Sequence, residues 1–487
     1  MSTLVSGGKS KVMIDLTQKE RAINKVKTEI NKNIAAIIEM AKHCGYGELL
    51  YYLAYLHFIR LIRKQDTTQE DEQVVLSLYA RQATEALKYT IQIIVKYSAK
   101  CYIKNEMDGT SINESLVQSI IKSSIWLNSQ YEMLFFFTMF NNLEVLGKRN
   151  QKIRIDMKKA LDKDESLKRY LLYAARVEIR NNIQSDNLKI KDDFLTYFKK
   201  EYAAYSDLFQ QTFGISIDTF IGIINWILDT ISAQVKNNEK KFVFLENGNI
   251  SAKAYGTIMY FGQSLLLEKK LLFNKFGKKI KKIITRLTYK PEEFDEQQLK
   301  YNLIARQPII NFDSHFLIIS PEILLDSLFV NTHYSLLETG QSKEEYKKRY
   351  SKTFIDKISK KASKVGFLEV GRGLELYEDG DNIGDIDLIL KNNNNNHFLL
   401  VEAKNHALPL DVYFHDFEAT RKRLKELTEE WENKVDRRYK HLKANHSKYG
   451  IGDSFKYIIV SRSPEIISHF SQYLIVSLDE FERIYQI

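Results

Sequence analysis

Cysteine is scarce in this sequence and long apolar runs are missing. Its 487 residues include only two cysteines, Cys44 and Cys101, which form neither a metal-type spacing nor a disulfide framework. The most apolar stretch, 133–140, is far shorter than the roughly 20 residues needed to cross a bilayer. The polar segment 1–19 lacks the apolar core of a signal peptide. We therefore expect a cytoplasmic protein with no membrane partner.

Proline is absent from the first 290 residues. The five prolines are Pro291, Pro308, Pro321, Pro409 and Pro464. Because proline breaks helix interiors, so long a stretch without it indicates helices, and apolar residues such as Ile34, Ile37 and Ile38 recur at helical spacing. Helices are expected near 73–99, 112–146, 165–182, 190–210 and 215–236. No repeat of fixed period is found, so a helical bundle over 1–240 is favoured over a solenoid. It would regulate, recognise a partner or form a homo-oligomer.

Positive charge exceeds negative charge along the chain. Lysine and arginine number 72 against 62 acidic residues, which gives a formal net charge of +10. Such a balance favours a polyanionic partner such as nucleic acid, although lysine-rich composition alone also produces it.

The segment 241–342 has mixed character. A short apolar run at 242–245 precedes the turn signal Asn247-Gly248-Asn249, and 316–319 reads as a strand before a helix that begins at Pro321. A basic helix lies between them. Its basic residues are Lys269, Lys270, Lys275, Lys278, Lys279, Lys281, Lys282 and Arg286. This helix is either an ordinary solvated surface or a phosphate-contacting one.

From residue 343 to 487 the pattern becomes α/β. Strands are expected at 367–370, 383–390, 397–404, 457–461 and 474–477. Helices are expected at 344–364, 411–446 and 479–485, the last with Asp479 as its N-cap. The asparagine tract 392–396 is typical of a hairpin loop between two strands.

Two of these strands carry the residues on which a functional prediction depends. Side chains alternate along a strand, so Asp385 and Asp387 share one face of the first, and Glu402 and Lys404 share one face of the second. Because the asparagine loop makes the strands antiparallel neighbours, Asp387 and Glu402 can meet. Paired carboxylates suit Mg²⁺, which prefers oxygen ligands and keeps several waters. A neighbouring lysine can hold an attacking water or stabilise charge on phosphorus.

The residues Gly384-Asp385-Ile386-Asp387 followed by Glu402-Ala403-Lys404 resemble the PD-(D/E)XK nuclease superfamily. The resemblance covers about 140 residues. It implies a restriction-endonuclease-like α/β/α domain with a mixed sheet. Ile386 stands where the motif's name has proline, a departure common in that superfamily.

The resemblance also implies roles for individual residues. Asp387 and Glu402 would bind Mg²⁺, or Mn²⁺ in its place, with the Ala403 carbonyl as a further ligand. Lys404 would assist the attacking water. A helix-borne acid would complete the ligand set, with Asp356 as the candidate and Glu345 as the alternative. The implied activity is a Mg²⁺-dependent endonuclease acting on DNA, RNA not being excluded, in restriction or anti-phage defence.

Other interpretations of these residues stay open. The same fold could bind nucleic acid without cutting it, the hairpin could carry only a surface ion-pair cluster, or the chain could be a helical scaffold. His406 could contact a phosphate or have no role, and the basic half of the long helix, 434–448, could line a DNA groove. Trp431 is expected in the core. Gly7-Gly8-Lys9-Ser10 is not a phosphate loop, because Thr3 stands where its first glycine belongs.

Overall fold

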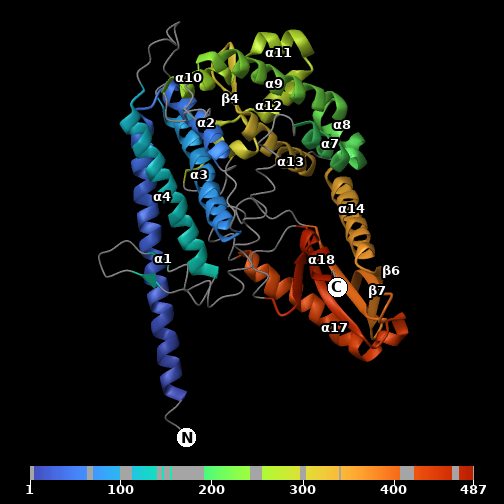
Figure 1. Ribbon diagram of the computed structural model, residues 1–487. Coiled ribbons are helices and arrows are strands. Elements are labelled where there is room, and N and C mark those ends of the chain that lie inside the picture. Colours follow the sequence, from blue (N-terminus) through green and yellow to red (C-terminus); the bar gives the residue numbers. More distant parts are fainter. Residues whose placement is uncertain are drawn as a thin grey trace. The chain divides into compact units, whose positions relative to one another are not determined.

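Helices dominate the first part of the computed structural model (Figure 1). The structure describes residues 5–62, 70–98, 112–139, 145–146, 154–155, 191–241, 255–296, 303–338, 342–405, 422–462 and 471–485. Contacts divide the chain into two units, Met1–Lys343 and Glu344–Ile487. The predicted sequence of a helical region followed by a C-terminal mixed sheet is confirmed.

The first four helices pack through apolar stripes. They are α1 (Val5–Ala41), α2 (Tyr46–Ile62), α3 (Glu70–Tyr97) and α4 (Glu114–Met139). On α1 the buried residues Val26, Ile30, Ile34 and Ile37 recur every three or four positions, which places them on one side of the helix. The predicted helix at 165–182 and the apolar run at 242–245 lie outside the described residues.

The rest of the first unit combines helices with small sheets. Its helices are α7 (Lys191–Tyr202), α8 (Ser206–Phe213), α9 (Ile217–Asn238), α10 (Tyr255–Ser264), α11 (Lys269–Phe276), α12 (Ile280–Leu287) and α13 (Pro321–Glu338). Strands β3 (Leu266–Glu268), β4 (Ile309–Asn311) and β5 (Phe316–Ile319) form an antiparallel sheet of order β3-β5-β4, and β1 (Val145–Leu146) pairs with β2 (Arg154–Ile155). Only β5 was predicted, because the other strands are two or three residues long.

Two predicted helices are each divided in the structure. The single basic helix expected over 269–286 breaks at Gly277, whose φ of 69° ends α11 before α12 begins. The helix expected over 190–210 is interrupted by a 3-10 turn at Ala203–Tyr205.

One further property of the helices bears on a membrane partner. Among the described residues no single helix is long and apolar enough to span a bilayer, whereas the bent pair Phe194–Phe213 and Ile217–Lys241 meets that test when taken together.

The second unit is built on a five-stranded mixed sheet. Its order is β10 (Leu474–Ser477), β9 (Phe455–Ser461), β8 (Phe398–Lys404), β7 (Asp381–Asn392) and β6 (Phe367–Glu378). Neighbours β6, β7 and β8 run antiparallel, whereas β8, β9 and β10 run parallel. The predicted asparagine hairpin is confirmed, since Asn392 N–H donates to the His397 carbonyl at 2.8 Å.

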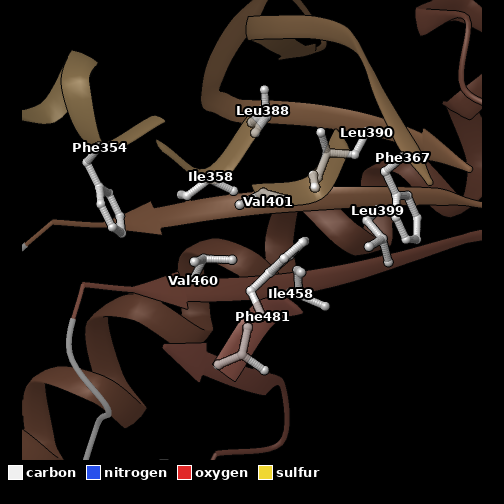
Figure 2. Close-up of a cluster of buried hydrophobic side chains, with 12 residues drawn as sticks. Phe354, Ile358, Phe367, Leu388, Leu390, Leu399, Val401, Ile458, Val460 and Phe481 are labelled. Atoms are coloured by element: carbon white, nitrogen blue, oxygen red, sulfur yellow. The ribbon is translucent and has the colours of Figure 1, made fainter. Parts of the chain in front are cut away.

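One face of this sheet is covered by α14 (Ser342–Lys364) and α18 (Leu478–Tyr485). Figure 2 shows Phe354 and Ile358 of α14 against Leu388, Val401 and other buried strand residues. Helix α17 (Glu432–Asn445), continuous with a π-helical turn at Glu426–Trp431, contacts strand residues whose side chains point away from that core.

The N-terminal cap of α18 differs from the prediction. Asp479 was expected to cap the helix, but Ser477 does so. Its hydroxyl accepts from Glu480 N–H at 3.2 Å, and the Glu480 carboxylate accepts from Ser477 N–H at 3.0 Å. This reciprocal arrangement is a capping box.

Candidate active site

Strand register places Asp387 and Glu402 on the same face of the sheet. The last paired residues of β7 and β8 are Leu388 and Val401, and both point into the core beneath α14. Because side chains alternate along a strand, the adjacent Asp387 and Glu402 point to the opposite face. Lys404 shares that face.

The two strands separate at this point. Beyond Leu388 and Val401 the β7–β8 ladder ends, whereas β7 stays paired with β6 as far as Asp381. The Ala403 N–H donates instead to Asp387 Oδ2 at 2.7 Å. A side-chain carboxylate thus takes the place of a ladder carbonyl, and the sheet opens where the acidic pair lies.

The Glu402 carboxylate is buried and contacts two cations. Its Oε1 accepts from Lys404 Nζ at 2.7 Å, and its Oε2 accepts from Arg438 Nη1 at 2.5 Å. The Tyr457 hydroxyl donates to Oε2 at 3.4 Å. Glu402 is 5% exposed, so these partners supply the compensation that a buried charge needs.

Arg438 reaches this site from α17. It belongs to the basic segment 434–448 that could line a DNA groove, but it is 7% exposed and points inward. The reason is its position: Trp431, Val435, Arg438 and Leu442 are spaced by four, three and four residues, and all are buried. They form the inner stripe of the helix.

Gly384 makes room for Arg438. A Cβ at Gly384 would lie 2.5 Å from Arg438 Nη2, and the glycine has a φ of 109°, which other residues rarely adopt. Arg438 Nε also donates to the Ile383 carbonyl at 3.4 Å. The glycine of the Gly384-Asp385-Ile386-Asp387 motif therefore accommodates a guanidinium.

The electrostatics of the site oppose ionisation of Asp387. Burial, and then the charge of Glu402, raise the pKa of Asp387 from 3.8 to about 6, against the lowering effects of Ala403 N–H and Lys404. Burial and Glu402 likewise raise the pKa of the Tyr457 hydroxyl far above its ordinary value, so this phenol acts as a hydrogen-bond donor.

The proposed helix-borne ligands lie in ion pairs of their own. Asp356 Oδ1 accepts from Arg372 Nη1 at 2.6 Å, and Arg372 also binds Glu369 through two bonds of 2.9 Å. Glu345 accepts from Arg349 at 2.7 Å. A role for either carboxylate in metal binding stays a prediction.

Trp431 and His406 were also considered in the sequence, and Asn405 directly follows the motif. Trp431 is 4% exposed, with Lys404 Nζ 5.4 Å and Arg423 Cζ 4.4 Å from its ring centroid, so it is a core residue that packs against cations. Asn405 Nδ2 donates to the Tyr350 carbonyl at 2.7 Å, whereas His406 lies outside the described residues.

The donor set at the site suits a divalent cation in part. In the described ranges, no group of three or more histidine, cysteine, aspartate or glutamate side chains is gathered for metal binding. The pair Asp387 and Glu402 nevertheless offers oxygen donors. Burial, and then the charge of Glu402, raise the pKa of Asp387, and a bound cation would favour its ionised form. Because Mg²⁺ keeps several waters, two carboxylates are an adequate protein contribution.

Sequence reasoning identified the acidic pair and Lys404 but assigned Arg438 to the surface and gave Tyr457 and Gly384 no role at the site. The inner stripe of α17 was the available signal for Arg438. Comparison with known proteins yields no relative, since no protein-family model, no curated protein and no solved structure matches this chain.

Proposed function

We propose that this chain is a Mg²⁺-dependent endonuclease that hydrolyses phosphodiester bonds of DNA, with RNA as the other possible substrate. One observation carries the proposal: Asp387, Glu402 and Lys404 gather on one face where β7 and β8 separate. A partly buried carboxylate with a raised pKa beside a second carboxylate is common at functional sites.

In this proposal Asp387 and Glu402 hold Mg²⁺, or Mn²⁺ in its place, with the Ala403 carbonyl and Asp356 as predicted further ligands. The bound cation would lower the pKa of a water and offset charge that develops on the phosphate. Lys404, held at 2.7 Å from Glu402, would orient that water and stabilise the phosphorane oxygens. With a pKa near 6, Asp387 is mostly ionised at pH 7 and can serve as a ligand.

Arg438 has a positioning role in the same mechanism. Its bond to Oε2 fixes the Glu402 carboxylate, and Tyr457 donates to the same oxygen. Both of these bonds are to Oε2, whereas Lys404 donates to the other carboxylate oxygen, Oε1. Arg438 therefore sets which way Glu402 faces.

Supercoiled-plasmid nicking in Mg²⁺ tests the proposal. The double variant Glu402→Ala, Lys404→Ala removes a ligand and the water-orienting amine, so we expect a loss of at least about 100-fold in rate. The control is Glu239→Ala, Lys241→Ala, which alters an exposed Glu-x-Lys on a 3-10 turn of the first unit. Equal nicking by the wild type and the site variant would overturn the proposal.

A second candidate is a nucleic-acid-binding protein that does not cleave. It is favoured by the two cations on Glu402, which occupy both oxygens that a metal would need. Calorimetry with Mg²⁺ and Mn²⁺ separates the candidates. Salt-sensitive DNA binding without any heat of metal binding supports the protein that binds nucleic acid without cleaving it. Metal binding that is abolished in Glu402→Ala supports the nuclease. A place in restriction or anti-phage defence, and homo-oligomer formation by the helical region, rest on the sequence prediction alone.

A further inference from the structure

The segment 269–290 of the first unit carries charge of one sign. It contains nine lysine and arginine residues and no aspartate or glutamate. Three of the nine have structural contacts. Lys269 donates to Asn311 and Asp313, Lys290 pairs with Glu293, and Arg286 lies over the Phe213 ring at 5.6 Å. The other six are exposed.

These six residues form what we call the lysine face. It consists of Lys270, Lys275, Lys278, Lys279, Lys281 and Lys282. No ion pair joins any of them to an acidic residue in the part of the chain that the structure describes. Surface lysines elsewhere in the unit are often paired, as Lys42 is with Glu39 and Lys199 with Asp218. The lysine face therefore concentrates uncompensated positive charge.

The backbone beneath the lysine face is fixed by packing. The inner side of α12 is formed by four buried apolar residues, Ile280, Ile283, Ile284 and Leu287. On α11, Leu272 is buried, and Phe276 meets Trp226 of α9 edge-to-face at 5.4 Å. The charges are thus presented on an anchored surface, which reduces the entropy lost when a partner binds.

We propose that the lysine face binds the sugar–phosphate backbone of a nucleic acid strand. The choice of this polyanion rests on the proposed function, which it extends by giving the helical unit a sequence-independent binding surface. Rows of lysines supply phosphate contacts without reading bases. The half-exposed Phe273 offers a ring on which a base of a single-stranded segment can stack.

An anionic membrane is the competing partner for such a surface, and the packing argues against it. The apolar side of α12 is buried within the unit, so it has no face to insert into a bilayer. Leu271 and Phe273, at 46% and 38% exposure, are the only exposed large apolar side chains on α11 and α12. Stable interfacial helices need a broader apolar face.

Fluorescence anisotropy tests this inference. Labelled single-stranded and duplex DNA of 30 nucleotides would be titrated in EDTA over a series of salt concentrations, so that binding is measured without cleavage. In the triple variant Lys278→Gln, Lys279→Gln, Lys281→Gln we expect the salt-dependence slope to decrease by about 2 to 3 and affinity at low salt to fall by at least about 10-fold. In Phe273→Ala we expect weaker binding to the single strand only.

The matched control is Lys32→Gln, Lys122→Gln, Lys200→Gln, which removes the same charge from exposed positions on three other helices. Equal losses in both triple variants, or no loss in the first, would overturn the inference. So would a loss of binding to phosphatidylserine vesicles without a loss for DNA. Nicking by the wild type is measured in a separate assay. If the proposed nuclease activity is absent, the DNA-binding measurement in EDTA still tests the lysine face. Unchanged melting temperatures would show that the variants fold.

Discussion

Asp387 is an acid kept in surroundings that disfavour its charge. Its pKa is raised to about 6, so the folded protein binds this proton more tightly than the unfolded chain, in which the ordinary value is 3.8. The contribution of Asp387 to stability is therefore greatest below about pH 4 and is lost as pH rises through 6. Such a cost is typical of a residue retained for chemistry.

The variant Asp387→Asn tests this account of the residue. Asparagine cannot ionise but can still accept the Ala403 N–H. We expect the free energy of unfolding at pH 8 to increase by up to about 3 kcal/mol, with little gain at pH 4. Urea unfolding at the two pH values measures the change, and the control is Asp381→Asn, which alters an exposed carboxylate at the start of β7. Destabilisation by Asp387→Asn at pH 8 would contradict the electrostatic account.

At the scale of single residues, the sequence predicted the charged residues that alternate along the apolar strands. It did not predict the partner of Glu402, which comes from a helix far along the chain. Asp387, Glu402 and Lys404 stand out because charges interrupt otherwise buried strands. Arg438 did not, because it lies among many charges of one helix, and only the stripe with Trp431 and Val435 marks it as buried. The ion pair of Asp356 with Arg372 could not be predicted from residue spacing, because it depends on how α14 packs against β6.

Among the elements, helix and strand ends were the least predictable feature. The strand predicted at 367–370 runs to Glu378, past Gly371 and Gly373, which disfavour strands when taken alone. Its continuation depends on the turn at Asp379 and Gly380, whose positive φ values of 51° and 92° are typical of a tight hairpin. The Asp-Gly pair was a hairpin signal that sequence analysis did not use.

The cap of α18 gives a prediction at the scale of an element. Ser477→Ala removes the acceptor for Glu480 N–H and should destabilise the protein by about 1 kcal/mol. Glu480→Ala removes the reciprocal bond. Because both act through one capping box, the double variant should lose less than the sum of the single losses, as a double-mutant cycle in urea would show. Additive losses would indicate that the two bonds form independently.

The whole molecule consists of two units with separate cores. The core of Glu344–Ile487 is made by one sheet and the helices α14 and α18, all within that unit. Units of this kind commonly unfold as separate cooperative transitions. The sequence located the change of pattern near 343 because helical periodicity gives way there to alternation, but it did not show that 241–342 belongs with the helical unit.

Calorimetry of the full chain tests the independence of the units. We expect two transitions. Arg438→Met leaves Glu402 buried with one cation fewer, so it should lower the stability of the second unit by about 3 to 5 kcal/mol and shift only one transition. Lys281→Gln, on the exposed side of α12, is the control and should shift neither by more than about 0.5 kcal/mol. Movement of both transitions by Arg438→Met would show that the units unfold together.

The guanidinium of Arg438 has a consequence for how the second unit matures. Many metal sites leave their carboxylates mutually repelling until the ion arrives, so that folding waits for the metal. Here Glu402 meets a resident counterion from α17 in a place kept open by Gly384. If Mg²⁺ binds as proposed, the domain would fold before the ion arrives, and a chelator would remove the ion and leave the domain intact, ready to be reloaded.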